Sequence, residues 1–500
     1  MNDSRPPAAE TVGPARLHPV WVLSAFANGV RNSIALFIGV GLSLRSQSGL
    51  VLLGGIAGLL LLILGYRLLQ WLRTSYAAAD GTVTLQTGIL NRIERVVPVE
   101  RIQNVNTVAT PIDRLFGTLQ LAIETAGTGE RLTLETLSRD QAAALEGWIE
   151  RQRTGRPEAQ AAAQAGQERE QQPGTSLYVM SPSDLLAAGL TSGRVGPALA
   201  LIAAAVRFGT DIVPERYWER LPFEPDDVSA RSLVILLIVS ALLAWLLSIA
   251  SAFIAYWQFT LALEDDALII TTGLLDRRRI VIPRARIQAI SMIEGPLRQP
   301  FGYASVMIES ASRFAGELED AGSQTLVPLM RRDAIPDLIA RAAPGYHVDQ
   351  DLTIEPLPRR ALRRYLVASG RDGLLIIGAA TLFFALLSRT PWWYGLALLP
   401  LVPLLMLYGY AQFRDAGWAI DSHDRLVVRR RSIDRITTIT QRQRVQTRSL
   451  SRSIFQRRAD LATITIKLAG RSARGTMRLV HLDMSDGLRI AERLRTLPRR

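Results

Sequence analysis

The sequence predicts a membrane protein of mixed α and β class. Three transmembrane helical hairpins are each followed by a small β-sandwich or barrel that a C-terminal helix caps. Two observations lead there. The mean hydropathy of the 500 residues is +0.15 although 21% of them are charged, so very apolar segments alternate with very polar ones. In addition, one strand-rich segment occurs three times along the chain.

Uncharged apolar stretches predict the spans. Four of them cover residues 49–66, 232–257, 373–387 and 392–410. Uncharged runs of about 18 residues or more are typical of transmembrane helices. The stretch 373–387 is shorter, and its pairing with 392–410 supports it. Residues 20–42 and 185–206 are also predicted to span, although Arg31 and Arg194 interrupt them. The six segments form three pairs, which predicts three hairpins.

The charges around the spans predict their orientation. Residues 211–231 hold six acids and three arginines, whereas the segments between the hairpins are rich in arginine. The positive-inside rule then places the large polar regions in the cytoplasm. Arg31, Arg194 and Arg371 each precede an apolar run, and we interpret them as arginines that extend toward the headgroups.

The repeat is defined by a constant spacing. Residues 88–103 read GILNRIERVVPVERIQ and residues 273–288 read GLLDRRRIVIPRARIQ, so that Pro98 aligns with Pro283. A third copy, RSIDRITTITQRQRVQ, occupies residues 431–446 and has Gln441 in place of the proline. Turn signals precede the copies at 80–81, 265–266 and 423–424, alternating strand patterns follow, and each copy ends in a helix with a polar start. The alignment therefore predicts three related modules.

These patterns divide the chain into nine segments. They are an N-terminal tail (1–19), hairpin one (20–66), module one (67–153), an Ala/Gln-rich linker (154–183), hairpin two (184–257), module two (258–343), a basic juxtamembrane linker (344–371), hairpin three (372–410) and module three (411–500).

This plan of hairpins and modules, with the P-x-x-R-I-Q signature at 98–103 and 283–288, resembles the YdbT-like family of bacterial membrane proteins with pleckstrin-homology (PH)-like domains. The resemblance covers residues 17–500. It implies that the modules are PH-like domains, that the protein is not an enzyme, and that a smaller membrane protein with a single PH-like domain is its partner. The third module departs from the pattern at Gln441 and at Ala459-Asp460, where the other copies have Phe-Gly.

No pattern in the sequence indicates catalysis, a metal site or a cofactor. The chain contains no cysteine, and its four histidines lack the spacing of metal ligands. Lys467, the single lysine, follows isoleucine and not glycine, which excludes a P-loop.

The repeated Arg-x-Gln pair is the most specific motif. Alternate residues of a strand share one face, so each arginine is expected to point the same way as its glutamine. The pair either satisfies carbonyl groups inside the module or binds a ligand, and the sequence leaves both interpretations open. The pairs are Arg101 with Gln103, Arg286 with Gln288, and Arg444 with Gln446.

Two basic clusters are candidates for contact with anionic phospholipid or a protein partner. Residues 411–500 hold 21 basic and 8 acidic residues, a balance that equals the whole net charge of +13. Such a run is either a solvated face or a surface that binds phosphate headgroups; nucleic acid is less expected because no aromatic residues alternate with the arginines. The candidates in module three are Arg429, Arg430, Arg431, Arg435, Arg442 and Arg444, and the juxtamembrane candidates are Arg359, Arg360, Arg363 and Arg364.

The sequence thus predicts a scaffold in the inner membrane whose cytoplasmic modules bind proteins or anionic headgroups, with a role in cell-envelope maintenance or stress response. The alternative is a component of a transport or lipid-moving complex. A subunit whose partner carries an active site is a third, weaker hypothesis.

Overall fold

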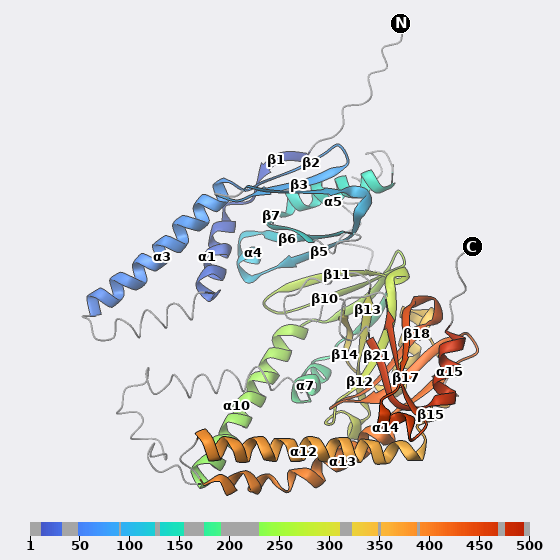
Figure 1. The fold of residues 1–500 in the computed structure, drawn as a ribbon. Helices are drawn as coiled ribbons and strands as arrows, with labels where there is room; N and C mark the ends of the chain where they lie inside the picture. The colour runs from blue at the N-terminus through green and yellow to red at the C-terminus, as the bar shows by residue number, and fades with distance from the viewer. Residues whose placement is uncertain are drawn as a thin grey trace. The chain divides into compact units, whose positions relative to one another are not determined.

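The computed structural model describes residues 12–32, 49–89, 92–125, 131–154, 175–191, 230–310, 323–348, 352–387, 391–468 and 476–494. The chain divides into two compact units (Figure 1), Met1–Ser176 with Trp257–Ile282 and Leu177–Tyr256 with Pro283–Arg500. Three predicted features lie largely outside the described residues: the linker from 155 onward, the later parts of the spans 20–42 and 185–206, and the acidic loop 211–231.

Unit one contains the first module and three strands of the second. In module one, two helices stand between the first strand and the second. The elements are β1 (Val12–Arg16), α1 (Val20–Asn32), α3 (Gly49–Leu72), β2 (Ser75–Ala79), β3 (Thr82–Thr87), β4 (Ile93–Pro98), β5 (Ile102–Ala109), α4 (Pro111–Phe116), β6 (Thr118–Thr125), β7 (Arg131–Ser138) and α5 (Arg139–Thr154). The strands of module two in this unit are β9 (Thr260–Glu264), β10 (Ala267–Thr272) and β11 (Arg277–Pro283).

The first strand of a module comes before its helices, which corrects the prediction that the whole module follows the hairpin. β1 pairs antiparallel with β2, so residues 12–16, assigned above to a tail, belong to the sheet. In unit two, β15 (Glu355–Pro356) pairs with β16 (Gly417–Ile420) across helices α12 and α13 in the same way. Strand β8 (Thr175–Val179) likewise precedes helix α7 (Pro182–Leu190). The helices are therefore inserted into each module.

Module one has a core formed by both of its sheets and its last helix. Tyr76 and Val83 come from the sheet β1-β2-β3-β4, Leu121 and Leu134 from the strands β6 and β7, and Trp148 from α5; all are almost fully buried. Alternating burial along β2 and β3 matches the period-two pattern of a strand with one buried face. Buried aromatic and aliphatic side chains of this kind supply most of the stabilisation of a small domain.

The second sheet of module one continues into module two. Its strands follow the order β7-β6-β5-β11-β10-β9, and β5 pairs antiparallel with β11. We call this contact junction one. One continuous sheet therefore contains strands of two modules.

Unit two contains the rest of module two and all of module three. Its elements, besides α7, are α10 (Ala230–Tyr256), β12 (Ile287–Glu294), β13 (Tyr303–Ser310), β14 (Ser323–Arg331), α11 (Ile335–Ala342), β15, α12 (Arg359–Leu387), α13 (Leu401–Asp415), β16, β17 (Arg425–Arg431), β18 (Arg435–Gln441), β19 (Val445–Ser451), α14 (Ile454–Arg457), β20 (Leu461–Leu468), β21 (Thr476–Asp483) and α15 (Met484–Arg493).

The sharing of sheets repeats in unit two. One sheet has the order β14-β13-β12-β18-β17-β16-β15, so that β12 of module two pairs with β18 of module three. We call this contact junction two. The remaining sheet, β19-β20-β21, belongs to module three alone. The core of module three contains Trp418, Leu426, Ile464 and Ile490, and the start of α12 adds Ala361.

Four described helices are long and apolar enough to cross a membrane: Gly54–Leu72, Ile238–Tyr256, Arg359–Leu382 and Gly395–Asp415. Each overlaps one of the four uncharged stretches that the sequence analysis predicted to span. Glycines lie where helices pack: Gly29 of α1 beside Ile63 of α3, and Gly373 of α12 beside Val402 of α13. Small residues let apolar helices approach closely.

Candidate functional site

The arginine of the repeated motif does not lie on a strand, which corrects the sequence interpretation. Arg101, Arg286 and Arg444 end the short 3-10 turns Val99–Arg101, Arg284–Arg286 and Arg442–Arg444, and the next strand begins one residue later. The premise that arginine and glutamine alternate along one strand is therefore wrong. The turns connect β4 to β5, β11 to β12 and β18 to β19.

The glutamines of the motif differ among themselves. Gln288 is buried and donates through Nε2 to the carbonyl of Arg286 at 3.1 Å, so it fastens the turn to the strand. Gln446 is exposed, and the side chain of Gln103 lies outside the described residues. Arg444 donates to the carbonyl of Ala285 at 2.7 Å, which links the turns of modules two and three.

Junction two holds a buried ion pair. Arg435 makes two hydrogen bonds to Glu294, at 2.6 and 2.7 Å, and the carboxylate is 3% exposed. The bond to Glu294 raises the pKa of Arg435. A guanidinium and a carboxylate joined in this two-pronged way are fixed in orientation as well as in position.

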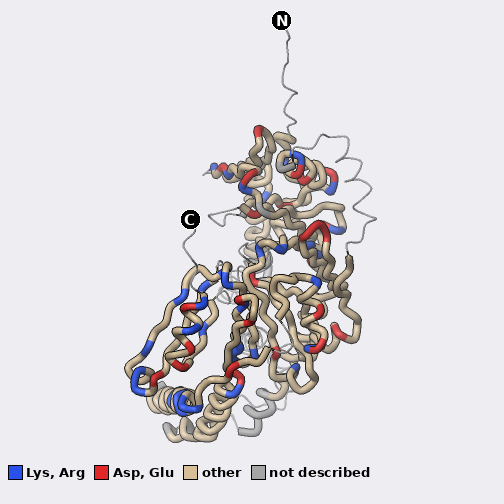
Figure 2. The backbone as a smooth tube through the Cα atoms, turned by 90° about the vertical axis from the view of Figure 1, so that its right-hand side faces the viewer, with Lys and Arg blue, Asp and Glu red and all other residues tan. Residues whose placement is uncertain are grey.

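Several other arginines of the β17–β18 region are held by acids. Arg431 bonds to the Asp415 carboxylate at the end of α13, and Arg429 donates to the Asp415 carbonyl at 2.9 Å. Burial, together with the charge of Arg435, lowers the pKa of Arg429. Basic segments in the strand-rich regions are interspersed with acidic ones (Figure 2). These arginines therefore fasten α13 to module three, a role that the sequence analysis did not assign to them.

Arg442 belongs to a second cluster. Its guanidinium lies 3.2 Å from Asp424, which also accepts a bond from Arg493 at 3.1 Å. The bond from Arg493 is the main reason why the pKa of Asp424 is lowered. An open cavity of about 720 Å³ lies beside the cluster, lined by Gly345 and Gln441 among others. Gln441, which replaces the proline of the other copies, donates to the carbonyl of Gly345 at 2.7 Å.

The juxtamembrane arginines are on two sides of α12. Arg360 bonds to Asp483 of module three, and Arg364 donates to the carbonyl of Phe455 at 2.6 Å. Tyr365, on the same side, donates to the carbonyl of Val480 at 3.2 Å. This side of the helix is attached to module three, so Arg360 and Arg364 hold the module against α12.

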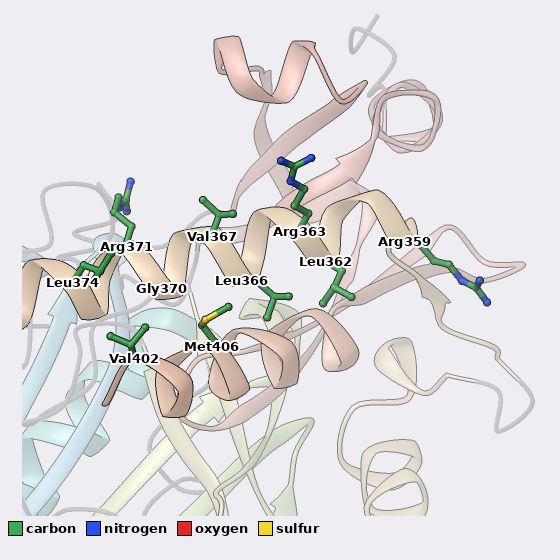
Figure 3. A pocket seen from close by; sticks show the side chains of 10 residues that line it. All are labelled: Arg359, Leu362, Arg363, Leu366, Val367, Gly370, Arg371, Leu374, Val402 and Met406. Carbon is green, nitrogen blue, oxygen red and sulfur yellow. The ribbon is translucent and has the colours of Figure 1, made fainter. Parts of the chain in front are cut away.

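The other side of α12 forms a groove with α13. Arg359, Arg363 and Arg371 line a cavity of about 610 Å³, and Leu362, Leu366, Leu374, Val402 and Met406 supply apolar walls. Figure 3 shows Arg363, Val367 and Arg371 leaving the same side of the helix, as their spacing of four residues requires, while Leu366 points toward Met406. The three arginines are exposed. A row of guanidinium groups thus borders an apolar groove on a helix long enough to cross a membrane.

The acids that hold these arginines were missed by the sequence analysis. Glu294, Asp415 and Asp421 are buried and each bonds to an arginine. For Asp415 and Asp421 the available signal was the rarity of acids, because residues 411–500 contain 8 acids against 21 basic residues. In such a region a buried acid requires a partner. In the described part of the chain no group of three or more His, Cys, Asp or Glu is placed to hold a metal ion.

Sheet-rich modules repeated along a chain with several apolar helices define a class of membrane proteins with PH-like modules. The sequence profile of the bacterial PH domain matches residues 33–153, 217–343 and 373–497, and the chain belongs to this family.

The chain is also similar to the UPF0699 transmembrane protein YdbT of Bacillus subtilis (strain 168). The two are 29% identical over 472 residues, which cover 92% of this chain and 93% of the relative. No solved structure gives a significant match. The protein is thus a membrane protein with three bacterial PH domains, related to YdbT over nearly its whole length.

Proposed function

We propose that the protein is a scaffold of the bacterial inner membrane that binds anionic phospholipid in the groove between α12 and α13. Arg359, Arg363 and Arg371 contact phosphate groups of lipid bound along the helix, and an acyl chain lies along Leu366 and Met406. The single observation that carries the proposal is that one groove has both surfaces: exposed guanidinium groups on one border and apolar side chains along its walls.

The choice of this groove over the basic strands follows from the partners of the arginines. Arg429, Arg431 and Arg435 bond to groups of the protein itself. Each arginine near an anionic surface contributes about 1 kcal/mol to binding, provided that it reaches the surface. The groove arginines lie on a candidate span and are exposed, and of the three Arg371 also donates to the neighbouring Asp372 at 2.7 Å.

The proposed topology has three helical hairpins with the PH-like modules in the cytoplasm. The apolar helices and the pairs α1 with α3, α7 with α10 and α12 with α13 support the hairpins. The excess of arginine on the modules supports the orientation. A scaffold with this topology presents its modules to protein partners, among them a smaller membrane protein with one PH-like domain, in envelope maintenance or stress response.

The test is lipid binding by the full-length protein in neutral detergent, measured by native mass spectrometry during titration with phosphatidylglycerol or phosphatidylcholine. We expect phosphatidylglycerol to bind more tightly. The triple variant R359Q/R363Q/R371Q is expected to weaken this binding by about 3 kcal/mol, on the order of a hundred-fold, since three charges are removed.

The matched control is R457Q/R458Q/R478Q, which removes the same charge from exposed residues of module three. It should bind as the unaltered protein does. Equal affinity for the two lipids, or equal losses in both triple variants, would refute the groove as the lipid site.

A further inference from the structure

Two strands have a free outer edge that their counterparts use for pairing. Strand β4 ends the sheet β1-β2-β3-β4, and β19 ends the sheet β19-β20-β21; no strand among the described residues pairs with either outer edge. The counterparts of β4 are β11 and β18, and the counterparts of β19 are β5 and β12. Those four strands form the two junctions.

Residues on the free edges are exposed, whereas the equivalent residues in the junctions are buried. This difference is expected if the free edges are interfaces without a partner. Ala289 and Ser291 of β12 are 0% and 3% exposed, whereas Thr447 and Ser449 at the equivalent positions of β19 are exposed. On β4, Val96 is 53% exposed. Unpaired edges with exposed apolar residues readily add another strand.

Both junctions have the same register. Ala109 pairs with Arg277 in junction one, and Glu294 pairs with Arg435 in junction two. Glu294 follows Ala109 by the 185 residues that separate Pro98 from Pro283, and Arg435 follows Arg277 by the 158 that separate Arg286 from Arg444. The chain therefore contains the same junction twice. The free edges of β19 and β4 are the two strand edges that a third junction of this kind would need.

We propose that β19 of one copy of this protein pairs antiparallel with β4 of a second copy, in the register of the two internal junctions. This register places Ser449 opposite Arg95, Ser451 opposite Ile93 and Thr447 opposite Val97. The contact is head-to-tail, so it can repeat from copy to copy along the membrane. Self-assembly of this kind goes beyond the proposed lipid contact and does not depend on it.

The side chains of the two edges fit this register. Residues directly opposite each other share one face of a sheet, so Glu94 lies on the same face as Arg448 and Arg452. These guanidinium groups are diagonal neighbours of the Glu94 carboxylate; Arg452, which the register places opposite Arg92, also donates to Asp460 at 3.1 Å. The opposite face brings together Ser449 and Arg95, at the positions that Ser291 and Thr438 occupy in junction two, where the two hydroxyl groups are 3.0 Å apart.

The test is disulfide cross-linking. Because the chain contains no cysteine, the introduced cysteines are the only ones that can form a disulfide. Membranes containing full-length Ser449→Cys and full-length Arg95→Cys are solubilised, mixed, reconstituted together and oxidised. Directly opposed residues of an antiparallel pair have Cα atoms about 4.5 to 5.5 Å apart, within reach of a disulfide. We expect a covalent dimer that is at least about ten-fold more abundant than with Ser449→Cys and Glu94→Cys, because Glu94 points to the other face.

The internal control is S291C/T438C in one chain, which should form its bond across junction two. With that control positive, absence of the mixed dimer would overturn the proposal. A bond that forms only within single chains carrying both Ser449→Cys and Arg95→Cys would also overturn it, since the two edges would then close on each other in one molecule.

Discussion

The two junctions share one register but differ in what holds them. Junction two has six consecutive residue pairs, from Ala289↔Thr440 to Glu294↔Arg435, and a buried ion pair. Junction one has three pairs, from Thr107↔Arg279 to Ala109↔Arg277. Next to these three pairs, side chains of β5 bond to the backbone of β11. Asn104 donates to the Val281 carbonyl, and Asn106 accepts from the Val281 amide at 3.2 Å.

We infer from this difference that backbone pairing at the strand edges sets the register of a junction, while the side chains set how stable the junction is. The repeated register survives although the residues at equivalent positions differ. Junction two is expected to open less often than junction one, because it has a longer ladder and a charged pair that is shielded from water.

The largest effect is expected from breaking the ion pair of junction two. Glu294→Gln removes the carboxylate to which Arg435 bonds and leaves Asp415, at 3.9 Å, as its nearest acid; removal of one partner of a buried pair costs about 3 kcal/mol. Hydrogen exchange of the β12 and β18 amides should accelerate by about a hundred-fold. The control is Glu264→Gln, which breaks the exposed pair with Arg279 and should cost less than about 1 kcal/mol. Equal acceleration in both variants would show that the buried pair does not hold the junction.

The second-largest effect is expected from low pH, which should destabilise module three through His481 without opening junction two. Burial lowers the pKa of His481 to about 4, with help from the charges of Arg364 and Arg478. The folded state therefore favours the neutral imidazole, and the unfolded chain takes up its proton near pH 6.5. The stability that the neutral imidazole provides is complete above pH 6.5, and about 2 kcal/mol of it is lost as the pH falls to 4.

Hydrogen exchange at a series of pH values, corrected for the intrinsic rate, measures this response. Strand β21 should open more readily at low pH in the unaltered protein and not in His481→Gln. A response that persists in His481→Gln would assign the titration to another group.

The smallest effect concerns junction one. Asn106→Ala removes the side chain that accepts from the Val281 amide and donates to Glu124 at 3.1 Å. Loss of the one bond that holds the Val281 amide costs about 1 kcal/mol locally, or about five-fold in the exchange rate of that amide. The β12 and β18 amides should not change. If they accelerate as much as Val281, the two junctions open as one unit and the comparison between them fails.

The modules could be predicted because each is specified locally. The turns are a clear case: Asp80, Asp266 and Asp424 have positive φ, as their turn signals suggest, and Asp460 takes the left-handed conformation of Gly117 and Gly302. The apolar helices followed from length and charge alone. Strands β1, β8 and β15 escaped prediction because they are short and a helix separates each from the rest of its sheet. A proline beside each helix start was the available signal, at Pro19, Pro182 and Pro358.

The junctions could not be predicted for a different reason. An alternating pattern tells which face of a strand is buried, but not which strand lies beyond its edge. The same limit applies to the candidate site. The sequence indicated the arginines but not their surroundings. Arg431 bonds to Asp415 at the end of α13, whereas Arg363 lines the groove between α12 and α13, and in both cases the neighbouring residues are distant in the sequence.

The measurement that tests the shared sheets most directly is intramolecular cross-linking at equivalent positions of the two junctions. The pairs are V108C/R278C in junction one and I293C/I436C in junction two. In full-length protein in native membranes, mild oxidation should close both pairs, and the junction two pair should resist reduction and exchange more strongly. If the modules were separate sandwiches, neither pair would close within a chain, and the account of one repeated junction would be contradicted.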